Sequence, residues 1–279
     1  MKKFGVGLQL YSVREAMAQD FEGTLEKVRD MGYEYVEFAG YFGRTSEQIK
    51  AILDKLGLKC VSVHQGIEFF DEDPDEKAEF LKGFGVKYSV IPWYGKEKLL
   101  GTAEWDKTVE NFKNAAELLR RHDMVLGYHN HDFEFERFEG KYLHDAIFEQ
   151  VGEDNIIPEL DTCWVHYAGI RPDEKIREFA GRVPIVHLKD FVCKNLGAGP
   201  VYALIDTNGN STKKASRADN GFEFRAVGRG IQDMKSILEA CEQSGTEIVI
   251  VEQDSPSEGF GELESVKLSR DYLKETFGI

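Results

Sequence analysis

One pattern repeats along the whole chain. A short apolar run is followed by a segment with helical periodicity and then by a glycine, after which the next run begins. The runs are nearly continuously apolar and number eight, at residues 4–10, 33–38, 58–64, 86–93, 124–129, 156–161, 183–189 and 247–252. Such runs are typical of parallel strands buried on both faces. Strict alternation of strand and helix therefore predicts an α/β fold, a single (β/α)8 TIM barrel that forms one domain over residues 1–279.

The segments between the runs carry the helical period. The clearest set lies on one face of a long helix and comprises Trp105, Val109, Phe112, Ala116 and Leu119. Glycines that follow several of these segments are typical of helix C-caps. No G-x-G-x-x-G follows the first run, so an open dinucleotide-binding sheet would lack its phosphate cradle.

One long loop interrupts the alternation, at residues 191–225 after the seventh strand. It is far longer than the usual connection of about 2–6 residues, and it lies on the face where barrels place their active sites. We expect a lid or a contact between copies of the chain there, with a disordered loop as the alternative. A basic cluster inside it, interpreted as solvent-exposed, contains Lys213, Lys214 and Arg217.

Charge and composition exclude several kinds of partner. The chain has 35 Lys and Arg against 50 Asp and Glu, and its net charge of −15 repels nucleic acid at long range. The four cysteines are widely spaced without a C-x-x-C, which indicates reduced thiols in a cytoplasmic protein. We recognise no signal peptide and no apolar stretch of about 18 residues. No nucleic-acid or membrane partner is therefore expected.

Polar residues gather at the C-terminal ends of the predicted strands, which in a barrel face the active site. Histidines found there are His64, His129, His131 and His187. Asp161, His187 and Glu252 end three consecutive strands, so their side chains should converge. Two carboxylates and an imidazole suit Mn²⁺, Co²⁺, Mg²⁺ or Zn²⁺, and a cation would relieve the repulsion between the carboxylates. The sequence thus predicts one divalent metal ion at this place.

These segments resemble the xylose-isomerase-like TIM barrels, a group of sugar phosphate isomerases/epimerases, ketohexose 3-epimerases and inosose dehydratase. The resemblance spans the whole chain and rests on residues 7–12, residues 32–37, Leu160-Asp161-Thr162, Val186-His187-Leu188-Lys189-Asp190 and Val251-Glu252-Gln253. It implies a metal held by Glu, Asp, His and Glu from strands five to eight. Asp161, His187 and Glu252 match the last three of these ligands.

The first ligand departs from the family pattern. Where relatives carry an acidic residue, this chain has His129-Asn130-His131, and inosose dehydratase is more similar here. Either His129 is the fourth ligand, which its position favours, or Glu134 reaches back to the metal. The missing glutamate is also an acid/base in the epimerases. His131 or Glu134 is the candidate to replace it, with Glu252 opposite.

Isomerases, epimerases and dehydratases of polyhydroxy ketones share one hard step, the removal of a proton next to a carbonyl. A divalent metal stabilises the enediolate that forms. Lys189 lies on the same strand face as His187 and can donate to the developing oxyanion, unless it forms a salt bridge to a carboxylate such as Glu159. Trp93 and Trp164 are candidates to stack on a sugar ring. The candidate substrate-binding residues are Gln9, Glu37, His64, Trp93, Glu159 and Arg229.

The leading hypothesis is a divalent-metal-dependent isomerase or epimerase that acts on a small-molecule sugar or keto-polyol. The alternative is a dehydratase or lyase that eliminates water or an aglycone from a 3-keto sugar or inosose at the same site. Without a phosphate cradle, an unphosphorylated substrate is preferred. The negative charge disfavours a nuclease of the abasic-site type, and the intact ligand set disfavours a non-catalytic sugar-binding barrel.

Overall fold

Eight parallel strands close into a barrel in the order β1-β12-β9-β8-β5-β4-β3-β2. The structure is a computed structural model that describes residues 4–197 and 220–279. The barrel strands are β1 (Gly5–Gln9), β2 (Tyr35–Phe38), β3 (Lys59–His64), β4 (Tyr88–Ile91), β5 (Val125–His129), β8 (Ile156–Asp161), β9 (Ile185–Leu188) and β12 (Ile248–Val251). Each lies within one of the eight predicted runs, and the predicted (β/α)8 barrel is confirmed.

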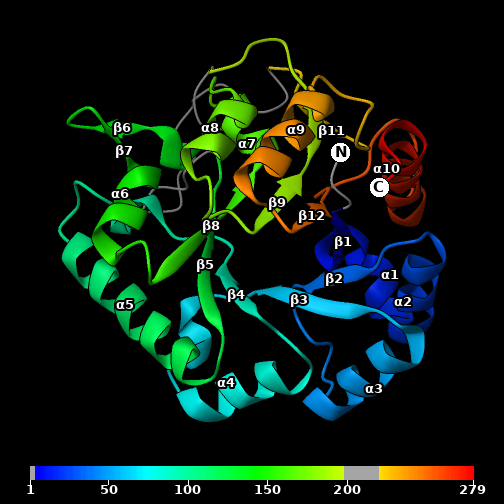
Figure 1. Cartoon of the computed structure of the whole chain (residues 1–279), viewed down its shortest axis with the longest axis horizontal. Coiled ribbons are helices and arrows are strands. Elements are labelled where there is room, and N and C mark those ends of the chain that lie inside the picture. The colour runs from blue at the N-terminus through cyan, green and yellow to red at the C-terminus, as the bar shows by residue number, and fades with distance from the viewer. Residues whose placement is uncertain (1–3, 198–219) are drawn as a thin grey trace.

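Helices surround the barrel (Figure 1). They are α1 (Arg14–Gln19), α2 (Phe21–Asp30), α3 (Ser46–Leu56), α4 (Pro74–Gly83), α5 (Trp105–Arg121), α6 (Leu143–Val151), α7 (Thr162–Tyr167), α8 (Pro172–Glu178), α9 (Met234–Ser244) and α10 (Glu262–Phe277). Short 3-10 helices are η1 (Leu10–Val13), η2 (Ile67–Phe70), η3 (Lys96–Lys98) and η4 (Phe133–Phe135). The apolar face predicted for α5 is buried. Gly57 and Gly245 end α3 and α9 in left-handed conformations with φ of 72° and 84°.

The barrel interior changes from apolar to polar along the strands. Its apolar part is formed by Val61, Tyr88, Val90, Ile185, Ile248 and Ile250. Successive strand residues face opposite sides, so the inward positions after this part fall on residues such as Glu159 and Asp161 in β8. The period of the strand thus brings polar side chains from neighbouring strands together at one end of a tightly packed barrel.

The long segment after β9 begins and ends as a short antiparallel pair, β10 (Asp190–Val192) with β11 (Glu223–Arg225). The Asp190 carboxylate holds the chain that follows β11 against β10. It accepts hydrogen bonds from the backbone N–H groups of Phe191, Gly228, Gly230 and Gln232. The proposed lid and the basic residues Lys213, Lys214 and Arg217 lie outside the described residues. A second small hairpin joins β6 (Arg137–Phe138) to β7 (Lys141–Tyr142).

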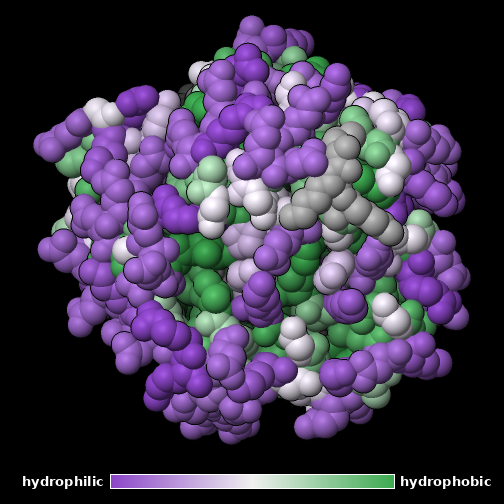
Figure 2. Space-filling view, in the orientation of Figure 1, coloured by the Kyte–Doolittle hydropathy of each residue, from purple (hydrophilic) through white to green (hydrophobic). Residues whose placement is uncertain are grey.

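The surface and the cysteines agree with the composition. Hydrophilic residues cover most of the face in Figure 2, with hydrophobic residues in the hollows between them. Cys60, Cys163 and Cys241 are buried and Cys193 is half-buried, and all of them are free thiols. Among residues 4–197 and 220–279, no helix has the length and apolarity needed to cross a bilayer.

Candidate metal centre

A cavity of about 630 Å³ opens at the C-terminal ends of the barrel strands. This volume lies in the range of small-molecule sites. Side chains that line it include Tyr11, Arg14, His64, Trp93, His129, His131, Lys189, Glu252 and Asp254. Tyr11, Arg14 and Asp254 were not predicted as site residues. Tyr11 directly follows a predicted strand and Asp254 lies two residues beyond another, and these positions were the available indication.

Four buried side chains at the floor of this cavity come from four adjacent strands and form the candidate metal centre. His129, Asp161, His187 and Glu252 each offer a ligand atom, and these atoms all lie within 4.8 Å of one another. The Nε2 atom of His129 is 3.6 Å from Asp161 Oδ2 and 4.0 Å from Glu252 Oε2. His187 Nδ1 lies 2.8 Å from Glu252 Oε2. The structure therefore brings together the four residues that the sequence predicted as ligands.

Asp161 is anchored through one carboxylate oxygen only. Its Oδ1 accepts from the backbone N–H of Cys163 at 2.8 Å and of Trp164 at 3.2 Å, which caps helix α7. Its Oδ2 is buried and has no hydrogen-bond partner among the described residues, although Lys189 Nζ is 3.4 Å away. Burial raises the pKa of Asp161 to about 7, although the Lys189 ammonium opposes the rise. A divalent cation would satisfy this oxygen.

The donor set fits a divalent metal ion. Two carboxylates and two imidazoles without cysteine suit Zn²⁺, Mn²⁺ or Co²⁺. Two hydrogen bonds hold the strand ends in place: Asn130 Oδ1 accepts from Asp161 N at 3.1 Å, and Thr162 Oγ1 donates to His187 O at 2.9 Å. The backbones of two of the four ligand residues, Asp161 and His187, are thus held by neighbouring side chains.

Lys189 is the main positive charge beside this centre. Its Nζ lies 2.6 Å from Asp254 Oδ1 and 3.2 Å from Glu252 Oε2. The pKa of Glu252 lies well below its usual value because Lys189 and His187 lower it more than burial raises it. Within the described part of the chain, Lys189 forms ion pairs with Asp161, Glu252 and Asp254. Glu159, the partner considered from the sequence, is not one of them.

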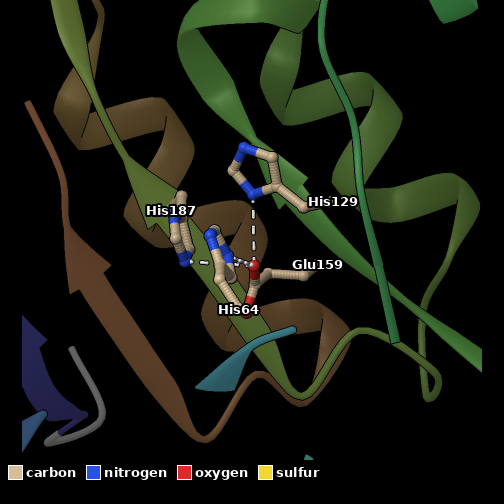
Figure 3. Close-up of side chains that lie close together, drawn as sticks. All are labelled: His64, His129, Glu159 and His187. Atoms are coloured by element: carbon tan, nitrogen blue, oxygen red, sulfur yellow. Dashed lines mark hydrogen bonds and ion pairs between the residues drawn. The ribbon is translucent and has the colours of Figure 1, made fainter. Parts of the chain in front are cut away.

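A second buried group, which we call the lower cluster, lies beneath the metal centre and consists of Glu37, His64, Glu159 and His187. Glu159 Oε2 is 2.7 Å from His64 Nε2, 3.1 Å from His129 Nδ1 and 3.2 Å from His187 Nε2 (Figure 3). The pKa of Glu159 lies below its usual value because His187 and His64 together outweigh the effect of burial.

Glu37 closes the lower cluster from the other side. Its Oε1 lies 2.9 Å from His187 Nε2, 3.1 Å from His64 Nε2 and 2.6 Å from the amide nitrogen of Gln9. Ser62, which was not predicted, donates to Glu37 Oε2. Gln9, Glu37 and Glu159 are fully buried here. These three predicted substrate-binding residues are not among the described residues that line the cavity, whereas His64, although part of the lower cluster, does line it.

Glu134 lies apart from both groups. Tyr128 precedes His129 in β5, so its side chain faces outward, and its ring is 6.0 Å from that of Phe112 in α5. Glu134 Oε1 accepts from the Tyr128 hydroxyl at 2.9 Å, and Oε2 accepts from the backbone N–H of His131 at 2.8 Å. The structure therefore holds Glu134 on the outer side of β5, and it does not join the ligands as the sequence alternative required.

The remaining predicted residues occupy different places. His131 is half-buried in the cavity wall, with its ring 5.9 Å from Phe133 in a stacked arrangement. Trp93 is 53% exposed at the mouth of the cavity. Trp164 is fully buried against Phe222 and so does not present a face for a sugar. Arg229 pairs with Glu258 at 2.9 Å and is not among the described residues that line the cavity, so its substrate-binding role stays a prediction.

Comparison with known proteins places these features in a context. A family model described as the xylose isomerase-like TIM barrel matches residues 25–276. The inosose dehydratase of Geobacillus kaustophilus (strain HTA426) is 26% identical over 189 residues, which are 60% of this chain and 61% of that protein. The chain therefore spans less than two thirds of the length of this curated relative.

Solved structures share the fold over nearly the whole chain. A sugar phosphate isomerase/epimerase from Parabacteroides distasonis ATCC 8503 has a TM-score of 0.77 at 20% identity, and the match covers 98% of this chain and 99% of that one. The IolI protein with a bound zinc atom has a TM-score of 0.71 at 16% identity, with 99% of this chain and 100% of that chain covered. At these identities the likeness concerns the fold.

Proposed function

The chain belongs to the xylose isomerase-like TIM barrel family, and on this premise we propose that it is a divalent-metal-dependent isomerase or epimerase acting on a sugar or keto-polyol. The observation that carries the proposal is the convergence of two carboxylates and two imidazoles at the cavity floor, with Asp161 Oδ2 buried and lacking a hydrogen-bond partner among the described residues. His129, Asp161, His187 and Glu252 would hold the cation. When bound, such an ion supplies positive charge that stabilises negative charge on the substrate oxygens.

We assign proton transfer to two side chains, Glu252 and His131, one on each side of the substrate. Glu252 follows β12 and His131 follows β5, and in the barrel these strands are separated by β8 and β9. Both residues line the cavity. A molecule lying over Asp161 and His187 would therefore have Glu252 on one side and His131 on the other. A carboxylate and a neutral imidazole can both take a proton from the carbon next to a carbonyl.

Lys189 supports the same step as a donor. Its ammonium lines the cavity and lies within 3.4 Å of an oxygen of Asp161, of Glu252 and of Asp254. In this position it can donate to an oxygen on which negative charge develops. Trp93 is exposed at the mouth of the cavity and offers a ring face to the C–H groups of a sugar.

A dehydratase or lyase acting on an inosose or a 3-keto sugar is the second candidate. Two observations favour it: the curated relative is an inosose dehydratase, and β5 carries His129 where an epimerase of this family places a carboxylate base. The first step would be the same. The reactions differ in whether the proton returns to carbon or a β-hydroxyl leaves.

Incubation with candidate ketoses and an inosose in D₂O, with Mn²⁺, Co²⁺ or Zn²⁺ added, separates these possibilities. Deuterium at the α-carbon of a product that has not lost water supports an isomerase or epimerase. A product lighter by one water supports the dehydratase. The proposed function would be refuted if a protein shown to bind the metal catalysed neither exchange nor elimination with any of the metals added.

The His131→Gln variant tests the second proton-transfer group. If Glu252 removes the proton and His131 returns one, this variant should still exchange the α-hydrogen with D₂O while product formation is lost. Tyr11→Phe, which alters another cavity-lining residue to which no proton transfer is assigned, is the control. Equal loss of exchange and of turnover in His131→Gln would contradict the assignment of His131.

A further inference from the structure

We infer that Glu159 is a positioning residue that orients both imidazole ligands of the metal centre and that it is what allows a histidine to serve as a ligand at position 129. The inference rests on the proposed metal centre and adds a role that lies one layer below it. Glu159 is fully buried and does not line the cavity. It can therefore influence the metal centre only through the histidines that it contacts.

The rings of His129 and His187 each have one nitrogen facing Glu159 and the other facing the metal centre. His129 directs Nδ1 to Glu159 Oε2 at 3.1 Å and Nε2 to Asp161 Oδ2 at 3.6 Å. His187 has the opposite orientation: its Nε2 lies between Glu37 Oε1 at 2.9 Å and Glu159 Oε2 at 3.2 Å, and its Nδ1 is 2.8 Å from Glu252 Oε2 in the metal centre. Figure 3 shows both rings converging on the Glu159 carboxylate, with the second nitrogen of His129 directed away from it.

This arrangement selects the tautomer that a metal requires. A neutral imidazole carries its proton on one nitrogen and a lone pair on the other. A carboxylate beside Nδ1 of His129 holds the proton there and leaves the lone pair of Nε2 for an ion. At His187 the carboxylates of Glu159 and Glu37 both face Nε2, so together they favour a proton on that nitrogen and leave Nδ1 available. Carboxylate partners of this kind also make the ligating nitrogen more basic.

The same atoms could in principle surround a second ion, because His64, His129, Glu159 and His187 also lie within 4.8 Å of one another. That ion would need the lone pair of Nδ1 of His129 and of Nε2 of His187. The first ion needs the lone pairs on the opposite nitrogens of the same rings. Neutral imidazoles cannot serve both ions, so the geometry favours Glu159 as a hydrogen-bond acceptor over Glu159 as a metal ligand.

Glu37 supplies the matched comparison for Glu159. Both carboxylates are fully buried and both contact His64 and His187. Only Glu159 also contacts His129, since the contacts of Glu37 within the described residues go to Gln9, Ser62, His64 and His187. A difference between the two glutamine variants therefore reports the His129 contact. Glu134→Gln is a further control, because it alters a buried carboxylate that lies outside both groups.

The experiment measures binding of Co²⁺ alone to the metal-free protein, by calorimetry and by the visible absorption of the bound ion. Glu159→Gln should weaken Co²⁺ binding by about 10–100-fold and change the absorption band, because the amide can donate to the histidines and disturb their tautomers. Glu37→Gln should cause a smaller loss, and Glu134→Gln should leave the affinity unchanged. Equal affinities for Glu159→Gln and Glu134→Gln would overturn the inference while the proposed function stood.

A double-variant cycle connects the effect to position 129. A glutamate ligand needs no proton acceptor behind it, and Glu159 would repel it. In a His129→Glu background the penalty of Glu159→Gln should therefore shrink, because only the contact of Glu159 with His187 still contributes to it. An undiminished penalty would show that Glu159 acts elsewhere. Two equivalents of Co²⁺ in the wild type, with one lost in Glu159→Gln, would make Glu159 a ligand and also overturn the inference.

A measurement on the unaltered protein covers the case in which a variant does not fold. Nitrogen NMR of ¹⁵N-histidine in the Zn²⁺-loaded chain distinguishes protonated from metal-bound ring nitrogens. The inference requires a proton on Nδ1 of His129 and on Nε2 of His187. The opposite tautomer at either ring would refute it. Failure of the wild type to bind a stoichiometric ion would instead refute the metal centre and the proposed function.

Discussion

Replacing Glu134 with glutamine distinguishes a structural role of this residue from a catalytic one. Its carboxyl group is fully buried between the Tyr128 hydroxyl and the backbone N–H of His131. Glutamine has the shape of the protonated acid. Its oxygen can accept from the backbone and its amide can donate to the Tyr128 oxygen, so the local contacts should survive the substitution.

The expected effect on stability follows from the pKa of this group. Burial raises the pKa of Glu134 from its usual 4.5 to about 8. The folded chain therefore binds more protons than the unfolded chain between these two values. The stability contributed by the protonated group is present below about pH 4.5 and is lost as the pH rises through about 8. At about 1.4 kcal/mol per pH unit, the loss amounts to about 5 kcal/mol as an upper bound.

Urea unfolding of the wild type and of Glu134→Gln at pH 5, 7 and 9 measures this difference. Because glutamine does not titrate, the variant should gain on the wild type as the pH rises, by several kcal/mol across the range. Bound metal and turnover at pH 7 should be retained. Parallel pH dependences of the two proteins would refute the reasoning. Loss of turnover with the metal still bound would make Glu134 the acid/base that the sequence suggested.

Three further substitutions test other parts of the structure. Asp161→Asn should keep the cap of α7 through its amide oxygen yet lose most of the bound metal, as measured by elemental analysis, and stoichiometric metal would contradict the ligand assignment. Gly230→Ala would place a Cβ atom 2.4 Å from the backbone oxygen of Phe191 and should lower the free energy of unfolding by about 1–3 kcal/mol, whereas Gly261→Ala meets nothing within 4 Å and serves as its control in the same urea titration. Trp93→Ala should raise KM without changing Co²⁺ affinity, and an unchanged KM for every accepted sugar would exclude stacking on this ring.

Asp161, His187 and Glu252 could be predicted together from strand register and strand alternation, whereas His129 followed from the family resemblance with Glu134 as the alternative. Parallel strands that share a register bring residues such as Asp161 and His187 level with each other. Alternation along each strand then decides which side chains face inward. Glu252 lies two residues beyond Ile250, which is level with His187, and so points the same way. The positions of the strand ends and the two-residue alternation of side chains are enough to predict that Asp161, His187 and Glu252 converge.

The depth of a side chain within the barrel was harder to infer. Gln9, Glu37 and Ser62 lie level with one another, although Gln9 and Glu37 were expected to face the substrate and Ser62 was not expected in the site. Strands of a closed barrel are tilted and staggered, so the last residues of different strands lie at different heights. A register shift between Val36 and Glu37 changes the pairing of β2 with β3 further. Stagger depends on the closure of the whole sheet and not on any one strand.

The places of the loop residues Glu134 and Arg229, both predicted as site residues, could not be inferred for a different reason. Glu134 lies in η4, beyond the end of β5, where strand periodicity no longer sets the direction of a side chain. Its orientation depends on the Tyr128 hydroxyl, and a hydroxyl on the outer face of the barrel is invisible to an argument about inward positions. Arg229 is similar, since Glu258, a residue from a distant loop, decides where its guanidinium lies.

The exchange of a carboxylate for His129 changes the charge of the centre as well as its ligands. With both carboxylates charged and both imidazoles neutral, the four ligands carry two negative charges, where a glutamate at position 129 would make it three. An ion in the less negative site binds less tightly but is the stronger Lewis acid. A residue that holds the two histidine ligands in their binding orientation would offset this loss of metal affinity without adding charge to the ligands. The buried Glu159 carboxylate is placed to do this, because it touches both rings and is kept from the cavity by the residues it orients.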